Sequence, residues 1–263
     1  MSRLETTFAA LRSTGRTGLV TYATAGDPDV PRTAAVLAGL ARGGADVIEV
    51  GVPFSDPIAD GPAIQRASER ALAAGASLDT ALEAVSAFRR EFQTPVVMFT
   101  YVNPVLRMGL DTFVARAGDA GVDGVLLLDL PIEEAGPARR ALDARGIDQI
   151  FLISPTTSDA RLAEAARLGR GFLYAISRLG VTGTRDTVAA SAAPLVGRIR
   201  AVTDLPVALG FGLSRPEHVA EVAAFADAAV VGSAIVQTVA DASARGDEVG
   251  RAVEEFVRWL KGR

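Results

Sequence analysis

The chain has 263 residues, of which 49% are hydrophobic and 22% are charged, and its formal net charge is −4. This length is typical of a single α/β barrel, and the mild acidity gives no reason to expect nucleic acid as a partner. The absence of cysteine excludes disulfides and thiolate chemistry. The single histidine, His218, excludes a histidine-rich metal site, so no metal is expected.

The sequence shows no sign of membrane insertion or export. Residues 1–18 lack the basic start and apolar core of a signal peptide. No apolar run approaches the roughly 18–20 residues that cross a bilayer. We therefore expect a cytoplasmic protein without membrane contact.

Apolar runs and amphipathic stretches alternate along the whole chain. The amphipathic stretches predict helices over 2–13, 30–42, 62–74, 78–92, 111–119, 132–145, from about 159, over 191–202, after 212, after 232 and over 248–261. The apolar runs predict eight strands, over 18–24, 46–51, 95–100, 124–129, 147–153, 171–176, 206–209 and 226–231. Continuous rather than alternating apolar runs are typical of parallel strands that are buried on both faces.

Strict β–α alternation is compatible with an open doubly wound sheet or a closed barrel. Eight units in this length, with the unusual loops after the strands, favour an α/β (β/α)8 TIM barrel. We expect one domain over residues 1–263, with an extra N-terminal helix and short extra helices after strands 2 and 8. The stretch YVNPVLRMG at 101–109 is interpreted as a loop. A small residue followed by Asp recurs before strands, at Asp46, Asp123 and Asp227.

Glu49 lies in the middle of the second apolar strand. An ionised glutamate there is costly unless it is paired. Strand alternation turns Glu49 toward the barrel axis and Ile48 and Val50 toward the helices. A carboxyl group at the mouth of an apolar barrel has a raised pKa, which suits a general acid/base near neutral pH. The alternative is a solvated glutamate or one paired with a base such as Arg42.

The loop after this strand carries two further carboxylates. Asp60 precedes Gly61 and Pro62, so spacing alone favours a helix cap and a catalytic carboxylate equally. Pro53 and Asp56 are placed at the tip of the loop, where solvation is the default interpretation.

The loops after strands 7 and 8 predict a phosphate site. Gly210-Phe211-Gly212 follows strand 7, and Gly232-Ser233-Ala234 follows strand 8 and opens a helix. Glycines allow backbone N–H groups to approach an anion, and a helix N-terminus favours negative charge. Each motif alone is also compatible with a simple turn.

Two other features have open interpretations. The loop at 177–188 contains glycines and threonines and is either a mobile lid or an irregular surface loop. Tyr22, Tyr101 and Tyr174 fall at or beyond strand ends and either line a pocket for a flat aromatic ligand or pack in the core. His218, in the first turn of a helix, is interpreted as a solvated or capping residue.

Together these stretches resemble the tryptophan synthase α subunit family nearly end to end. The resemblance is carried by TAGDPD at 24–29, IEVGVPFSDPIADGP at 48–62, YVNP at 101–104, DLP at 129–131, SRLGVTG at 177–183, GFG at 210–212 and GSAIV at 232–236. Tyr22 and Val102 depart from residues that are common in the family, phenylalanine and tyrosine. Neither departure removes an acid, a base or a phosphate donor.

The resemblance implies a carbon–carbon lyase that cleaves indole-3-glycerol phosphate to indole and glyceraldehyde 3-phosphate by a retro-aldol reaction. It implies that Glu49 is the general acid/base and that Asp60 accepts a hydrogen bond from the indole N–H. The substrate-binding residues that it implies are Tyr22, Thr100, Leu127, Tyr174, Thr182, Gly183, Phe211, Gly212, Gly232 and Ser233. The only lysine, Lys261, is near the C-terminus, which excludes a Schiff-base aldolase.

The family's partner is a pyridoxal-phosphate (PLP) β subunit that receives indole for L-tryptophan synthesis. The resemblance implies an α2β2 complex that is docked through Pro53 and Asp56, with PLP in the partner and no cofactor in this chain. Two alternatives are a free-standing indole-releasing lyase and a weakly active subunit that mainly activates its partner.

Overall fold

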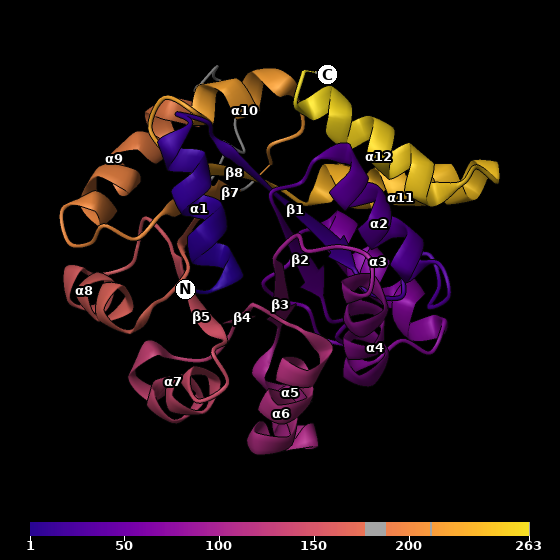
Figure 1. Ribbon diagram of the computed structural model, residues 1–263, viewed down its shortest axis with the longest axis horizontal. Helices are drawn as coiled ribbons and strands as arrows, with labels where there is room; N and C mark the ends of the chain where they lie inside the picture. Colours follow the sequence, from indigo (N-terminus) through magenta and orange to yellow (C-terminus); the bar gives the residue numbers. More distant parts are fainter. Residues whose placement is uncertain (177–187, 211, 263) are drawn as a thin grey trace.

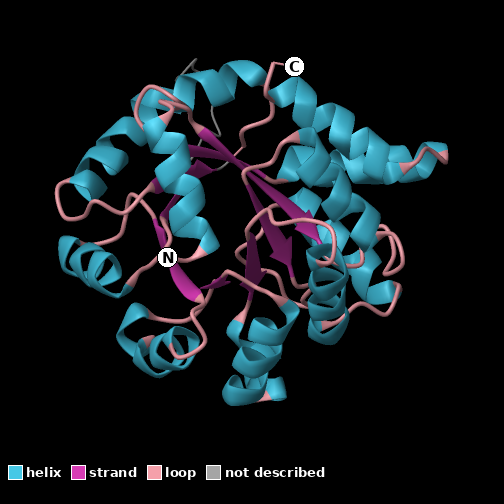
Figure 2. Cartoon of the chain, in the orientation of Figure 1, coloured by secondary structure: helices cyan, strands magenta, loops and turns pink. Residues whose placement is uncertain are grey.

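A computed structural model describes residues 1–176, 188–210 and 212–262. Parallel strands form a closed barrel in the sequential order β1 to β8, and helices surround it (Figures 1 and 2). The strands are β1 (Gly18–Thr24), β2 (Val47–Gly51), β3 (Val96–Thr100), β4 (Gly124–Leu127), β5 (Asp148–Ile153), β6 (Leu173–Ile176), β7 (Val207–Gly210) and β8 (Ala228–Val231). The predicted TIM barrel is confirmed.

The helices include the extra N-terminal helix and a pair of helices after each of β2 and β8, as expected. They are α1 (Arg3–Ser13), α2 (Thr33–Gly43), α3 (Pro62–Ala73), α4 (Leu78–Arg89), α5 (Val102–Met108), α6 (Leu110–Ala120), α7 (Gly136–Asp143), α8 (Asp159–Leu168), α9 (Val188–Arg200), α10 (Pro216–Val222), α11 (Ser233–Arg245) and α12 (Val249–Leu260). A 3-10 turn, η1 (Ile132–Glu134), precedes α7. None of the described helices is long and apolar enough to span a membrane.

Helix α5 lies where the sequence predicts a loop, so that prediction is wrong. Pro104 falls in the first turn of α5, where a missing backbone N–H costs no helical hydrogen bond. The N–H of Val102 donates at 2.7 Å to Oδ1 of Asp129, which lies in the turn after β4. A cap supplied by a distant segment leaves no signal in the local sequence.

The barrel interior is a separate apolar cluster to which every strand region contributes. Its members are Val20, Val47, Val97, Leu126, Ile150, Phe172, Ala208, Ala228 and Val230, together with Leu4, Phe8 and Leu11 of α1. Helix α1 starts with a capping box between Ser2 and Glu5. Its apolar face closes the N-terminal end of the barrel, so that the other end is left for the site (Figure 1).

The recurring aspartate before a strand stabilises this closed end. Each carboxylate accepts a 2.8 Å hydrogen bond from a backbone N–H near the start of the preceding odd-numbered strand: Leu19 to Asp46, Val96 to Asp123 and Val207 to Asp227. Each also pairs with at least one cation: Asp46 with Lys261, Asp123 with Arg89 and Arg3, and Asp227 with Arg200. We call these three residues the corner aspartates.

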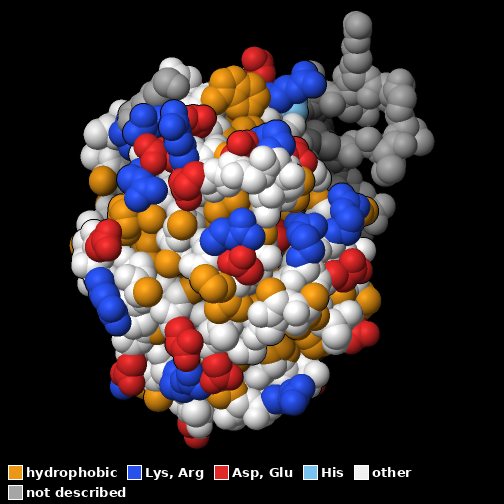
Figure 3. Space-filling model, turned by 90° about the vertical axis from the view of Figure 1, so that its right-hand side faces the viewer, with side chains coloured by type: hydrophobic (Ala, Val, Ile, Leu, Met, Phe, Trp, Pro, Cys, Tyr) orange, Lys and Arg blue, Asp and Glu red, His pale blue; other side chains and the backbone are white. Residues whose placement is uncertain are grey.

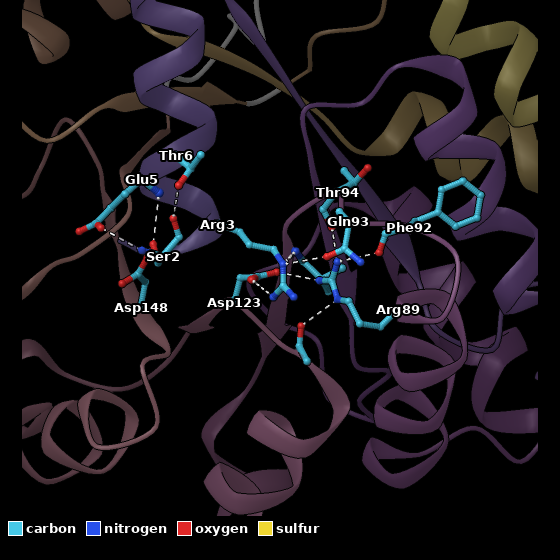
Figure 4. Close-up of polar contacts among 12 residues, drawn as sticks. Ser2, Arg3, Glu5, Thr6, Arg89, Phe92, Gln93, Thr94, Asp123 and Asp148 are labelled. Carbon is cyan, nitrogen blue, oxygen red and sulfur yellow. Dashed lines mark hydrogen bonds and ion pairs between the residues drawn. The ribbon is translucent and has the colours of Figure 1, made fainter.

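Figure 4 shows the network around Asp123. Arg89 donates to Asp123 Oδ2 at 2.7 Å and Arg3 to Oδ1 at 2.9 Å. Beside it, the hydroxyl of Ser2 donates to Asp148 at 2.6 Å. The network therefore ties α1 to the barrel rim. On the face shown in Figure 3, acidic and basic side chains are mixed rather than gathered by sign.

Candidate active site

Glu49 lies on β2 and faces the barrel axis, as predicted. Its flanking residues Ile48 and Val50 belong to the cluster that packs against the helices, whereas Val47 belongs to the interior cluster. Glu49 is 1% exposed, and its Oε1 has no hydrogen-bond partner among the described residues. Arg42, the expected alternative partner, pairs with Glu254 at 2.9 Å instead.

Burial determines the protonation of Glu49. Desolvation raises its pKa from the ordinary value of 4.5 to about 8. The apolar interior cluster beneath it supplies no charge to stabilise the ionised form. Glu49 is therefore protonated at neutral pH and able both to donate a proton and to take one back.

Asp60 lies in the loop between β2 and α3 and binds a side chain rather than the helix. The hydroxyl of Tyr101 donates to Asp60 Oδ2 at 3.0 Å. The N-cap of α3 is Gly61, and no side-chain cap is present there. The capping interpretation of Asp60 is thus wrong. Burial raises the pKa of Asp60, and the Tyr101 hydrogen bond opposes this rise.

Tyr22 and Tyr174 each interact electrostatically with both carboxyl groups, Glu49 and Asp60. Tyr22 on β1 is the register neighbour of Glu49, and Tyr174 lies on β6. The pKa of each phenol is raised, mainly by burial but also by the charges of Glu49 and Asp60. Tyr22, Glu49, Asp60 and Tyr174 therefore share one site at the open end of the barrel.

Two glycines at strand ends make room for these rings. A Cβ on Gly51 would lie 2.0 Å from the Tyr22 hydroxyl oxygen, and one on Gly210 would lie 2.5 Å from that of Tyr174. The Tyr22 ring also packs edge-on against Phe99, with centroids 5.3 Å apart. The Tyr22 ring therefore fits this wall of the site.

Thr100 and Leu127 are not brought to this site. On β3, Val97 and Phe99 face the axis, so alternation turns Thr100 toward the helices. The buried hydroxyl of Thr100 donates to its neighbour's carbonyl at 3.0 Å. On β4, Leu127 packs against the helix-side cluster.

The axis-facing positions belong to residues that sequence reasoning missed, Phe99 on β3 and Leu126 and Leu128 on and just after β4. Alternation counted from Val97 and along β4 was the signal that could have identified them. It is the same rule that placed Glu49 correctly.

The predicted phosphate loops lie at the ends of β7 and β8. Gly232 is the N-cap residue of α11 and has no side-chain cap, and the exposed Ser233 begins the helix. Gly212 has a φ of +76°, a left-handed conformation that favours glycine. The backbone N–H groups at the start of α11 are thus available to an anion. Phe211, Thr182 and Gly183 lie outside the described residues.

The loop after β2 also borders a groove of about 680 Å³. Its lining includes Pro53 and Phe54 from the loop and Asn103, Pro104 and Arg107 from α5. Pro53 is buried rather than at an exposed tip, whereas Asp56 is exposed.

The site consists of carboxyl, phenol and backbone groups. Among the described residues, no group of three or more His, Cys, Asp or Glu side chains is arranged to hold a metal. Lys261 lies at the closed end, where it donates to Gly44 O and Asp46. His218 Nδ1 accepts the N–H of Ser214 at 3.2 Å, just before α10, and the N-cap residue of that helix, Arg215, has no side-chain cap. The arrangement is suited to proton transfer to an aromatic, phosphorylated ligand.

Comparison with known proteins agrees with this geometry. A family model described as "Tryptophan synthase alpha chain" matches residues 8–262. The chain belongs to this family. A tryptophan synthase alpha chain of Geobacter sulfurreducens is 50% identical over 261 residues, which are 99% of this chain and 98% of that protein. One of Solibacter usitatus is 48% identical over 99% of this chain and 97% of its own length.

Solved structures of the family share the fold. The tryptophan synthase subunit alpha of Legionella pneumophila superposes with a TM-score of 0.89 at 37% identity, covering 100% of this chain and 98% of that one. A chain from the tryptophan synthase α2β2 complex of Pyrococcus furiosus gives a TM-score of 0.83 at 38% identity, covering 94% and 98%. The fold and family expected from the sequence motifs are confirmed.

Proposed function

We propose that this chain cleaves indole-3-glycerol phosphate to indole and glyceraldehyde 3-phosphate, as the α subunit of a tryptophan synthase. The observation that carries the proposal is the buried carboxyl group of Glu49, whose Oε1 has no hydrogen-bond partner among the described residues, in the same site as Asp60. Family membership supports the substrate and the reaction class.

In the proposed reaction, protonated Glu49 gives its proton to the indole carbon that bears the glycerol phosphate chain. The ionised carboxylate then takes the proton of the adjacent hydroxyl. The carbon–carbon bond breaks, its electron pair returns to the ring, and the hydroxyl carbon becomes the aldehyde carbon. Glu49 ends protonated, as it began, so no metal or cofactor is required in the balance.

Asp60 would accept the indole N–H and stabilise the positive charge that develops in the protonated ring. Tyr22, Phe99, Leu128 and Tyr174 would contact the ring, and with them Phe211. The start of α11, with Gly232 and Ser233, and Gly212 after β7 would hold the phosphate. Thr182 and Gly183 remain predicted contacts to Asp60 and to the phosphate.

A tryptophan synthase β subunit is the proposed partner, in an α2β2 assembly with PLP in the partner. The surface beside the site supports docking there. Ile58 of the β2 loop is 89% exposed and Leu106 of α5 is 66% exposed. Other residues of this loop and this helix, Pro53 among them, line the groove. Asp56 is exposed in the same loop and would contribute a charge to the interface.

The test is indole release from indole-3-glycerol phosphate by the isolated chain, repeated after addition of the β subunit. We expect measurable release alone and a clear increase with the partner. Release that the partner leaves unchanged would favour a free-standing lyase. Absence of release in both conditions would contradict the proposed reaction.

A further inference from the structure

Tyr101 makes three contacts with the loop that carries Asp60. It is the N-cap residue of α5, directly after β3, and is 3% exposed. Its hydroxyl donates to Asp60 Oδ2 at 3.0 Å and accepts the N–H of Ala59 at 3.0 Å. Its ring stacks on Phe54 of the same loop, with centroids 4.8 Å apart at 27°. The loop after β2 therefore packs around the side chain of Tyr101.

The other hydrogen bonds of Asp60 hold its backbone and not its carboxylate. The N–H of Asp60 donates to Pro57 O at 3.0 Å. The side-chain amide of Gln65 donates to Asp60 O at 3.0 Å and to Pro57 O at 3.3 Å. Among the described residues, the donor to the Asp60 carboxylate is the hydroxyl of Tyr101.

We propose that Tyr101 is the positioning residue of Asp60, fixing one carboxylate oxygen so that the other faces the indole N–H. The proposal rests on the function proposed above. With its hydrogen donated to Oδ2 and its oxygen accepting from Ala59, the phenol can occupy few orientations. Without this hydrogen bond the Asp60 carboxylate would rotate freely at the end of an irregular loop. A freely rotating carboxylate is a poorly oriented hydrogen-bond acceptor.

The charges around Tyr101 keep it a donor. Its pKa is raised above the ordinary value, first by burial and then by the charge of Asp60, with Asp129 acting in the same direction. The phenol is therefore protonated throughout the neutral range. In return, its hydrogen bond favours the ionised form of Asp60 against the effect of burial.

The experiment is a double-mutant cycle in the isolated chain with Tyr101→Phe, Asp60→Asn and both together. Tyr101→Phe keeps the ring and its stack on Phe54, so the fold is retained. A hydrogen bond to a charged group predicts a loss of about 10- to 100-fold in kcat for Tyr101→Phe, with KM changed by less than about threefold. In the Asp60→Asn background the same change should have no further effect.

A second readout is the pH profile. Removing the hydroxyl raises the pKa of Asp60, so the acid limb of kcat/KM should move to higher pH in Tyr101→Phe. Thr14→Val, which removes a hydroxyl bonded to Ala10 O at the closed end, is the control and should leave kcat unchanged.

Two outcomes overturn the proposal: unchanged kinetics in Tyr101→Phe, or equal losses in the wild-type and Asp60→Asn backgrounds. Equal losses would mean that Tyr101 acts independently of Asp60. Failure of the wild-type chain to release indole, with or without the β subunit, would instead contradict the proposed function.

Discussion

Carboxylates at the two ends of this barrel have opposite environments. At the closed end, each corner aspartate (Asp46, Asp123, Asp227) accepts a strand N–H and pairs with at least one cation. At the open end, Glu49 has an oxygen without a partner among the described residues, and Asp60 is bonded by a neutral phenol. The same chemical group is thus satisfied at one end and left reactive at the other.

This difference separates stability from chemistry. A satisfied carboxylate stabilises the fold, because its removal leaves buried donors and cations unpaired. An unsatisfied buried carboxyl group costs folding free energy and persists where function requires it. Exchanging a carboxylate for a neutral side chain should therefore have opposite consequences at the two ends.

The largest effect is expected for Glu49→Gln. The substitution keeps the shape of the side chain but removes its exchangeable acid proton. We expect kcat for indole release to fall by roughly 10²–10⁴-fold, the usual contribution of a general acid/base. The free energy of unfolding should stay the same or rise, because no ionised form has to be buried. Steady-state kinetics and denaturant unfolding measure the two quantities.

Glu254→Gln is the matched control for that variant. Glu254 lies on α12 and pairs with Arg42 and Arg258 in the outer helix layer. Its replacement should leave kcat unchanged. Near-normal turnover by folded Glu49→Gln would remove Glu49 from the mechanism, and a large loss of stability would contradict the assignment of its carboxyl group as unsatisfied.

A smaller effect, on stability and not on turnover, is expected for Asp123→Ala. The change removes the carboxylate that Arg89 and Arg3 share and leaves the buried N–H of Val96 without its side-chain acceptor. We expect a loss of about 2–4 kcal/mol in the free energy of unfolding. Turnover should be unchanged at temperatures where the variant is folded, since the site is at the other end.

Asp119→Ala is the control for Asp123→Ala. Asp119 is 76% exposed and pairs with Arg145 on the surface, where an ion pair contributes little. Its unfolding curve should overlay that of the wild type. A fall in kcat for Asp123→Ala without a loss of stability would mean that the closed end takes part in the reaction.

Much of this arrangement could be predicted from local pattern. Apolar runs located all eight strands, and alternation turned Glu49 to the axis, because both signals depend only on the strand itself. The resemblance predicted Thr100 and Leu127 at the site. Each lies one residue away from an axis-facing position of its strand, so its side chain faces the helices instead. The motif match identified the correct strands but not the face of each strand that points into the site.

What the sequence left undecided depends on contacts between distant segments. Spacing alone left Asp60 equally a cap or a catalyst, and the resemblance implied the catalytic role. The contact that holds its side chain comes from Tyr101, just after β3, and could not be predicted from the loop's own sequence. The recurring corner aspartates were visible as a pattern, but their partners come from other strands and helices. Helix α5 was missed for the same reason, because its cap is Asp129.

The smallest effect, about 2 kcal/mol between pH 6 and 7.5, is expected in the pH dependence of stability that Glu49 causes. Its pKa is about 8 in the folded chain, above the ordinary value of 4.5. Between these values the folded state holds a proton that the unfolded state has released. The stability that Glu49 contributes is therefore full below about pH 4.5 and is lost as pH rises toward 8.

The measurement is the free energy of unfolding of the wild type and of Glu49→Gln at several pH values, so that the effects of other groups cancel in the difference. Relative to Glu49→Gln, the wild type should lose about 2 kcal/mol between pH 6 and 7.5 and reach a plateau above pH 8. If Glu49 must donate its proton first, kcat/KM should fall as pH rises through about 8, the pKa of Glu49 in the folded chain. A flat difference would mean that Glu49 is ionised in the folded chain at neutral pH, and would abolish the contrast between the two ends.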